Sequence, residues 1–200
     1  MSRSRLLLPL FLVLNVSCAS ITVQDYADKT PGLALEEFFS GTLTAHGVVK
    51  NWRGQVIRTF NADIDAYWNN GVGTLEEDFL FDDGTVERRV WTLVPTAINR
   101  YRGTAGDVVG SGEVNVAGNA AFLDYVLRIP FNDGTLDVRI DDRMYLVNDT
   151  VLINESSLKK FGIKVGEILL VIEKRASYCS NSVRTRKASS AFSTGTNTWS

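Results

Sequence analysis

Two runs of strand-forming residues meet at Asp83-Gly84, and this junction constrains the fold more than any other feature. Asp-Gly is a strong signal for a two-residue β-hairpin, because a type I′ turn needs a positive φ at both central residues. Such a turn places Phe79 opposite Arg88 on the facing strand. The same pattern recurs at residues 131–135, where Phe-Asn-Asp-Gly-Thr repeats Phe-Asp-Asp-Gly-Thr. Two hairpins of one design indicate a meander of antiparallel strands.

Short strands separated by turns fill most of the sequence after residue 40. Residues 121–129 alternate well, with Leu123 and Tyr125 on one face and Asp124 and Arg128 on the other. Short helical pieces are expected at 35–39, before the first strand, and at 156–161. The expected strands are 41–49, 55–67, the two arms of 74–93, 97–103, 108–116, 121–129, 136–140, 144–147, 150–154 and 166–173.

Sequential hairpins favour an up-and-down β-barrel, because closure removes the exposed edges of a sheet. The fold class predicted from the sequence is therefore all-β, an antiparallel up-and-down barrel of about eight to ten strands. A barrel of that size has an interior that side chains fill or that holds one small ligand. We expect the barrel domain to cover residues 39–174.

Composition and motifs exclude several classes of function. A net charge of −2 gives no general attraction to nucleic acid, and a single histidine with two cysteines excludes a metal site of several His and Cys ligands. The histidine, His46, is expected to be a structural or surface residue. Asp141-Asp142 is predicted to be a strand-end turn, because adjacent strand residues point to opposite faces and cannot share one proton. With no catalytic motif, we predict no enzyme activity and no cofactor.

The first 18 residues have the pattern of an export signal. Arg3 and Arg5 give a positive start, and an apolar run follows at 6–14. That run is too short to span a bilayer, which needs about 20 residues. Residues 19–38 are then interpreted as a tether. After Lys174 the chain is basic, rich in Ser and Thr and free of Asp and Glu, so residues 175–200 are predicted to be a disordered tail.

Val16-Ser17-Cys18 resembles a bacterial lipobox, in which a small residue directly precedes the cysteine. The resemblance implies cleavage between Ser17 and Cys18 and lipid attachment at Cys18, and several lipid chains give stable anchoring. Ala19, in place of aspartate, implies sorting to the outer membrane with the domain facing the periplasm. The alternative is an ordinary secretory signal cut nearby, which leaves Cys18 without a lipid.

Short motifs spread over residues 35–174 form a specific pattern when taken together. They are Phe39-Ser40-Gly41-Thr42-Leu43, Arg53-Gly54, Arg58, the Asp83-Gly84 turn followed by Arg89 and Trp91, Tyr101-Arg102-Gly103, Asp107-Val108-Val109-Gly110, Gly118-Asn119-Ala120, Asp141-Asp142 with Met144-Tyr145, and Lys160-Phe161-Gly162 with Val165-Gly166-Glu167. With these motifs the chain resembles a bacterial family of predicted lipoproteins known as domain of unknown function 3833. Arg143 departs from it, because tryptophan is expected there. The resemblance implies a periplasm-facing lipoprotein with a lipocalin-like barrel and no known reaction.

Three hypotheses for the function remain open. The first is a binding module that holds a small apolar or lipid-like ligand in the barrel. The second is a structural or assembly protein of the envelope with a filled barrel, and the third is an enzyme of unidentified class. The ligand-binding candidates are Arg88, Trp91, Tyr101, Asn119 and Tyr125, since aromatic residues with one polar tip suit such pockets. The alternatives are core packing for the aromatic residues and cross-strand ion pairs with Glu76 and Asp78 for Arg88 and Arg89.

Overall fold

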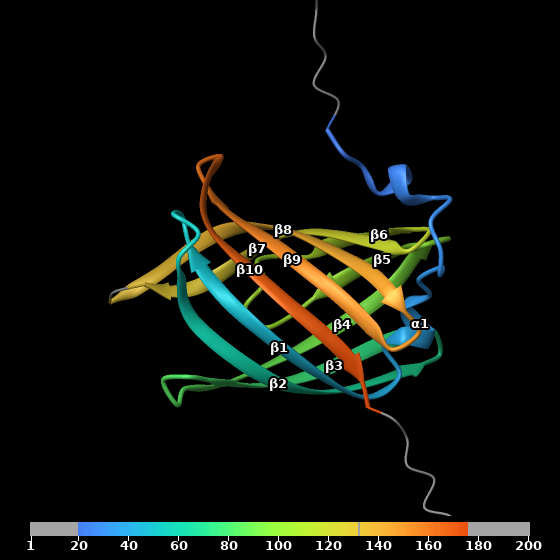
Figure 1. Cartoon of the computed structure of the whole chain (residues 1–200), viewed down its shortest axis with the longest axis horizontal. Coiled ribbons are helices and arrows are strands. Elements are labelled where there is room, and N and C mark those ends of the chain that lie inside the picture. The colour runs from blue at the N-terminus through green and yellow to red at the C-terminus, as the bar shows by residue number, and fades with distance from the viewer. Residues whose placement is uncertain (1–19, 132, 176–200) are drawn as a thin grey trace, which may run out of the picture.

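The first and last strands of the sheet pair with each other, so the sheet has no free edge. The computed structural model describes residues 20–131 and 133–175. All ten strands are antiparallel to their neighbours and each consecutive pair is adjacent, which confirms the predicted up-and-down β-barrel (Figure 1). The elements are η1 (Val23–Tyr26), α1 (Leu35–Phe38), β1 (Gly41–Asn51), β2 (Val56–Asn69), β3 (Val72–Phe81), β4 (Val86–Ala97), β5 (Arg100–Thr104), β6 (Gly112–Ala117), β7 (Ala120–Phe131), β8 (Gly134–Asn148), β9 (Val151–Lys160) and β10 (Ile163–Lys174).

Alternation of apolar and polar residues decides which face of each strand points inward. In β2, Phe60, Ala62 and Ile64 are buried, while Asn61 and Asp63 between them are exposed. Successive strand residues point to opposite faces, so the apolar row lines the barrel and the polar row meets solvent. The same rule holds around the ring, and the inward rows merge into one hydrophobic core.

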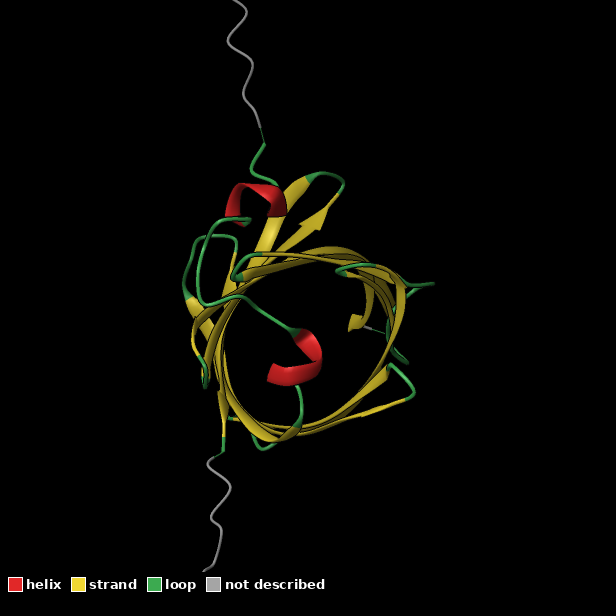
Figure 2. Ribbon diagram, turned by 90° about the vertical axis from the view of Figure 1, so that its right-hand side faces the viewer, coloured by secondary structure: helices red, strands yellow, loops and turns green. Residues whose placement is uncertain are grey.

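A short helix closes one end of the barrel. Figure 2 looks at this end and shows α1 lying inside the ring of strands. Leu35, Phe38 and Phe39 are 2%, 4% and 4% exposed and belong to the main core, and the indole nitrogen of Trp68 donates a hydrogen bond to the carbonyl of Phe39 (2.8 Å). This part of the segment interpreted as a tether is therefore packed into the barrel, and we call this side the closed end.

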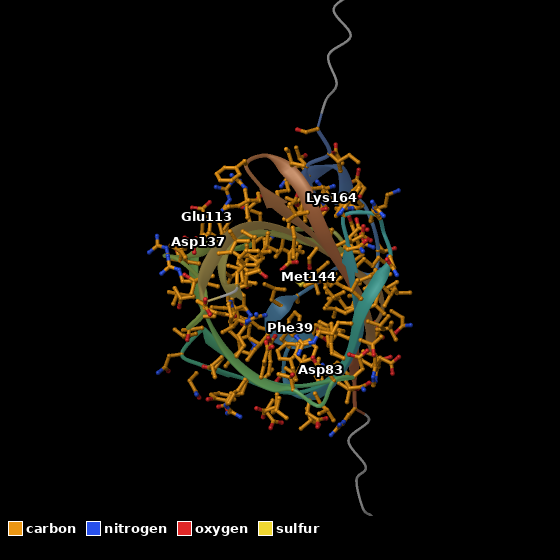
Figure 3. All side chains as sticks on the ribbon, turned by 90° about the vertical axis from the view of Figure 1, so that its left-hand side faces the viewer. Phe39, Asp83, Glu113, Asp137, Met144 and Lys164 are labelled. Carbon is orange, nitrogen blue, oxygen red and sulfur yellow. The ribbon has the colours of Figure 1, made fainter. Side chains whose placement is uncertain are left out.

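The opposite end carries four hairpin turns and has no helix across it among the described residues; we call it the open end. Figure 3 looks into it, with Phe39 visible at the far side within the ring of strands. Several inward-facing residues near this end are only partly buried, although Phe60 and Val138 are buried, whereas those near α1 are mostly buried. Water therefore reaches the inner wall from one side only. The partly buried inward residues include Phe79, Phe81, Ile129, Leu136, Leu158 and Leu170.

The β3–β4 hairpin differs by one position from the predicted register. Gly84 has a positive φ of 81° but Asp83 does not, and the amide of Phe81 donates to the carbonyl of Thr85 (3.0 Å). The connection therefore has three residues, as expected for a type I turn followed by a glycine bulge. Arg88 consequently pairs with Asp78 instead of Phe79. A shift of one residue moves every side chain to the other face, so Arg88 points outward and the predicted pairing is wrong.

Three further predictions are corrected in the second half of the barrel. Residues 134–148 form one continuous strand, so Asp141-Asp142 lies in the middle of β8 and is not a strand-end turn. Residues 156–160 belong to β9 rather than to a helix, because pairing with strands on both sides overrides local preference. The β7–β8 hairpin does not repeat the first, since Phe131 pairs with Gly134.

Gly118 provides a test of how the segment before β1 is held. Its φ is +52°, and a Cβ there would lie 1.8 Å from the carbonyl oxygen of Tyr26, next to η1. We expect Gly118→Ala to loosen residues 22–33 from the barrel as well as to strain the backbone. Gly84→Ala is the matched control, because Gly84 also has a positive φ (+81°) but nothing lies within 4 Å of its Cβ position.

The control should lose about 1–2 kcal/mol of stability from the strained backbone alone. Gly118→Ala should lose clearly more and should increase amide hydrogen exchange selectively in residues 22–33. Equal losses in the two variants, measured by chemical denaturation, would contradict this packing.

Candidate functional site

A group of polar side chains lies inside the barrel, surrounded by apolar ones. All but Asp107, which lies in the β5–β6 loop, take positions in the inward rows of strands: Glu77 follows Leu75 in β3, and Asp142 follows Ile140 in β8. Polar groups in such surroundings cost free energy unless they are paired, so their presence needs an explanation. We call this group the interior polar cluster; its members are Glu77, Arg89, Asp107, Tyr125, Asp142, Asn154 and Ser156.

Arg89 is the cation of the interior polar cluster. Its Nε and Nη2 donate to the carboxylate of Asp107, in the β5–β6 loop, at 2.9 and 2.7 Å. Across the β3–β4 ladder its direct partner is Glu77. Burial alone would lower the pKa of Arg89, but the hydrogen bond with Asp107 and the nearby Glu77 raise it above the usual value. Arg89 is therefore a permanent charge whose hydrogen-bonding fork is already occupied.

Burial raises the pKa of Glu77 to about 7. The Arg89 charge lowers the value, while the carboxylates of Asp142 and Asp107 raise it further. Glu77 is therefore close to half protonated at neutral pH. A carboxyl in this state can either accept or donate a hydrogen bond.

Asp142 is the most deeply buried carboxyl of the cluster, with 8% of its surface exposed. Burial raises its pKa to about 6, and the neighbouring Tyr125 hydroxyl and the Arg89 charge oppose this rise. Its Oδ1 atom is buried without a hydrogen-bond partner. Next to it, the hydroxyl of Ser156 donates to Asn154 Oδ1 (3.2 Å). An unsatisfied carboxylate oxygen at this depth costs about 1–3 kcal/mol or more, and a donor from outside the chain would remove that cost.

The wall between the interior polar cluster and the open end is apolar and aromatic. Phe60, Phe79 and Phe81 pack against one another with ring centroids 5.6–6.2 Å apart. The guanidinium of Arg89 lies 5.7 Å from the ring of Phe79, which joins this aromatic wall to the cluster. At the rim of this wall, Arg58 lies over the ring of Phe81 (3.5 Å) and is paired with Asp83 and Glu87, so the aromatic rings lie between a paired cation and the interior polar cluster.

The structure brings together two of the five residues predicted to bind a ligand. Trp91 and Tyr125 both point inward and make an edge-to-face contact at 5.2 Å, with Tyr125 next to Asp142. Tyr101 packs against Trp68 (5.8 Å) toward the closed end. Asn119 lies in the β6–β7 turn and donates to the carbonyl of Leu146 (3.1 Å).

Arg88 is on the outer face, where it forms ion pairs with Asp78 (2.7 Å) and Glu76. This placement confirms the expected cross-strand ion pairs for Arg88 and corrects its assignment to the barrel interior, which Arg89 occupies instead. The predicted cleavage and lipid-attachment residues, Ser17 and Cys18, lie outside the described residues.

Sequence reasoning missed most of the interior polar cluster. The signal was one acidic residue, Glu77, at the position between the apolar residues Leu75 and Phe79 in the row of alternate residues that faces inward.

His46 is on the outer face, with Nδ1 2.6 Å from Asn61 Oδ1. Among residues 20–131 and 133–175, no group of three His, Cys, Asp or Glu side chains is arranged to hold a metal ion. Within the same residues no helix is long and apolar enough to cross a membrane.

A closed up-and-down barrel with one plugged end, one open end and an inward polar cluster defines the class of this protein as lipocalin-like barrels. The chain belongs to the family described as protein of unknown function (DUF3833), whose model matches residues 12–174. This match confirms the resemblance seen in the sequence motifs. No curated protein matches the chain.

One solved structure supports the fold assignment. The S-type phycobiliprotein lyase CPES from Guillardia theta superposes with a TM-score of 0.51 at 14% identity, over 72% of this chain and 94% of that chain. The odorant binding protein OBP1 is more distant, with a TM-score of 0.36 at 10% identity, over 72% of this chain and 76% of that chain. At these identities the likeness concerns the fold alone.

The raised pKa values of Glu77 and Asp142 predict that stability depends on pH. A carboxyl with a higher pKa in the folded than in the unfolded state binds more protons when folded. The buried negative charge of Glu77 destabilises the folded state. This destabilisation is absent below the usual pKa of 4.5, where the carboxyl is protonated in both states, and is complete above about 7. The melting temperature should therefore rise as the pH is lowered from 8 to about 5.

Glu77→Gln should flatten this rise, because glutamine does not titrate. Glu113→Gln, at an exposed position of β6, is the matched control and should leave the slope unchanged. Thermal unfolding followed by circular dichroism across this pH range measures the effect. A Glu77→Gln variant with the same slope as the parent protein would show that Glu77 is not buried as described.

Proposed function

We propose that this protein binds a small amphipathic molecule inside its barrel. The apolar body of the ligand lies against the inner wall near the open end, and its polar end reaches the interior polar cluster. The observation that carries the proposal is the buried Asp142 Oδ1, which lacks a hydrogen-bond partner at the inner end of an apolar barrel. Pockets for small ligands typically combine apolar walls with a few convergent polar groups.

The charges of the interior polar cluster indicate the chemistry of the polar end. Three carboxyl groups accompany one arginine, and the fork of Arg89 is occupied by Asp107. Asp142 and Glu77 offer acceptors; the Nη1 atom of Arg89 is not bonded to Asp107, but it belongs to one cationic group against three carboxyl groups. The cluster therefore favours a ligand end that donates hydrogen bonds or carries a positive charge, and disfavours a carboxylate.

The proposal includes attachment to the bacterial cell envelope through a lipid on Cys18, with the barrel facing the periplasm. The leader pattern and the lipobox resemblance support it. The match to the family model begins at residue 12, so the matched region includes Cys18. In that setting a lipid-like or other poorly soluble molecule is the natural class of ligand, because the barrel shields apolar surface from water.

A filled, purely structural barrel is the second candidate. Dense packing supports it in the closed half, where Leu43 and Leu152 are 0% exposed and Ile140 is 1% exposed. Partly exposed inward residues at the other end favour binding instead. Native mass spectrometry of the protein after gentle extraction separates the two, because a carrier retains a small molecule and a filled barrel does not.

The binding site can be tested with N-phenyl-1-naphthylamine, a neutral apolar dye that fluoresces in apolar surroundings. Leu170 points into the barrel and is partly buried, whereas its neighbour Leu169 points outward and is 37% exposed. Leu170→Trp should reduce dye binding about tenfold or more, since an indole would occupy the entry space. Leu169→Trp is the matched control and should bind as the parent protein does.

Both variants should keep the β-sheet circular dichroism spectrum of the parent. Dye binding that is equal in the two variants would place the site outside the barrel and would reject the proposed function.

Competition against the same dye tests the polarity of the site. Dodecylamine should displace the dye at lower concentration than dodecanoate, because the interior polar cluster offers acceptors. Asp142→Asn should reduce this preference by severalfold, as it replaces the buried carboxylate with an amide. A stronger competition by dodecanoate would mean that Arg89 is available to ligands, contrary to its pairing with Asp107.

A further inference from the structure

Two neighbouring hairpin turns at the open end expose large apolar side chains. Trp52 in the β1–β2 turn is 67% exposed, and Phe161 and Ile163 in the β9–β10 turn are 91% and 70% exposed. Strand β1 pairs with β10, with Asn51 opposite Gly166, so the two turns lie side by side (Figure 1). Apolar residues are thus gathered on one side of the entrance.

Each of these turns also carries a cation against its aromatic ring. The guanidinium of Arg53 is 4.6 Å from the ring of Trp52, and the Lys160 ammonium is 5.0 Å from the ring of Phe161. Arg53 forms no ion pair among the described residues. We name the group of Trp52, Arg53, Lys160, Phe161 and Ile163 the rim patch. Its combination of aromatic and basic residues is that of segments which lie in the interface of a bilayer.

The backbone at Phe161 is unfavourable for the residue that it carries. Phe161 has a φ of +51° and Gly162 has a φ of +78°, and Lys160 pairs with Ile163 across the turn. This is the geometry of a two-residue type I′ turn, in which Asn-Gly is the favoured sequence. A bulky residue with a positive φ is strained. Here the chain keeps a strained, solvent-exposed phenylalanine that nothing in the fold requires.

We propose that the rim patch docks the open end of the barrel on the surface of an anionic lipid bilayer. The aromatic and aliphatic side chains enter the headgroup region, and Arg53 and Lys160 meet the lipid phosphates. The charge of the patch selects this occupant, since bilayers with anionic headgroups attract basic residues. Docking at this end places the entrance of the barrel against a reservoir of amphipathic molecules. The inference does not depend on what the barrel binds.

The experiment reads insertion at one site, which keeps it separate from binding through the leader or a lipid anchor. The full-length chain carries Cys18→Ser and Cys179→Ser, so that no acylation occurs and an added cysteine is unique. An environment-sensitive nitrobenzoxadiazole dye is placed at Gln55→Cys, beside Trp52 in the β1–β2 turn. The matched control carries the dye at Asp149→Cys, in the β8–β9 turn near the closed end.

With vesicles of phosphatidylcholine and phosphatidylglycerol, the emission at position 55 should shift to the blue and the emission at 149 should not. Adding Phe161→Asn should raise the lipid concentration needed for half of the blue shift at position 55 about tenfold, as expected for losing a partly buried aromatic ring. The same variant should melt at an equal or higher temperature, because asparagine tolerates a positive φ. Loss of binding therefore cannot be ascribed to unfolding.

Three results would overturn the proposal. One is an unchanged emission at position 55 in the presence of the anionic vesicles. Another is an equal shift at both dye positions, which indicates adsorption through another part of the chain. The third is a blue shift at position 55 that needs no more lipid with Phe161→Asn than without it, or that is the same on vesicles of phosphatidylcholine alone. Dye displacement from the barrel is measured separately, so failure here leaves the proposed ligand binding intact and failure there leaves docking intact.

Discussion

The ladder between β1 and β10 is the interaction on which the rest of the structure depends. It joins nine residue pairs, from Leu43 with Lys174 to Asn51 with Gly166. The paired strands are the first and the last of the domain in the sequence. Closing a loop of that length is entropically costly, so this ladder depends on the shorter hairpins being in place. Once it forms, the sheet has an inside. The inward rows then become a core, and the carboxyls of Glu77 and Asp142 become buried.

The two halves of the barrel divide stability and function between them. Near α1 the interior is filled by residues such as Leu43 and Leu152, and the plug residues Leu35 and Phe38 complete the packing. The packing of the closed half stabilises the fold, and the protein therefore tolerates the buried charges of the interior polar cluster. Proteins violate the rule against buried polar groups mainly at functional sites, and the violation has to be offset elsewhere. The closed half of the barrel supplies that offset.

The sequence was sufficient for the fold class, because alternation and turn residues act locally. Asp124 and Arg128 mark the outer face of β7 as clearly in the sequence as in the structure. The site was harder to predict, because it depends on the pairing between strands. One extra residue in the β3–β4 turn exchanges Arg88 for Arg89 in the interior, and a dipeptide pattern does not specify that length.

The convergence of the interior polar cluster was also beyond local reasoning. Asp142 and Ser156 pair directly across β8 and β9, but Glu77 lies on β3, far away in the sequence, and only closure of the barrel brings it to them. In the sequence, Asp141-Asp142 looks like a turn, because two adjacent acids are rare inside a strand. The structure shows the reason for the pair: Asp141 faces out to Arg143 and Lys159, and Asp142 faces in.

The positions of the two ends bear on what kind of binding protein this is. The described chain starts near the closed end, where η1 packs on Ala117 and Ala120 and the amide of Leu33 donates to Gly118 (2.7 Å). Cys18 precedes Ser20 by two residues and can reach only about 7 Å further. The open end lies about 30–40 Å from the closed end, given strands of this length and the usual tilt. The proposed anchor at Cys18 and the proposed docking of the rim patch are therefore separate contacts, made at different places on the barrel.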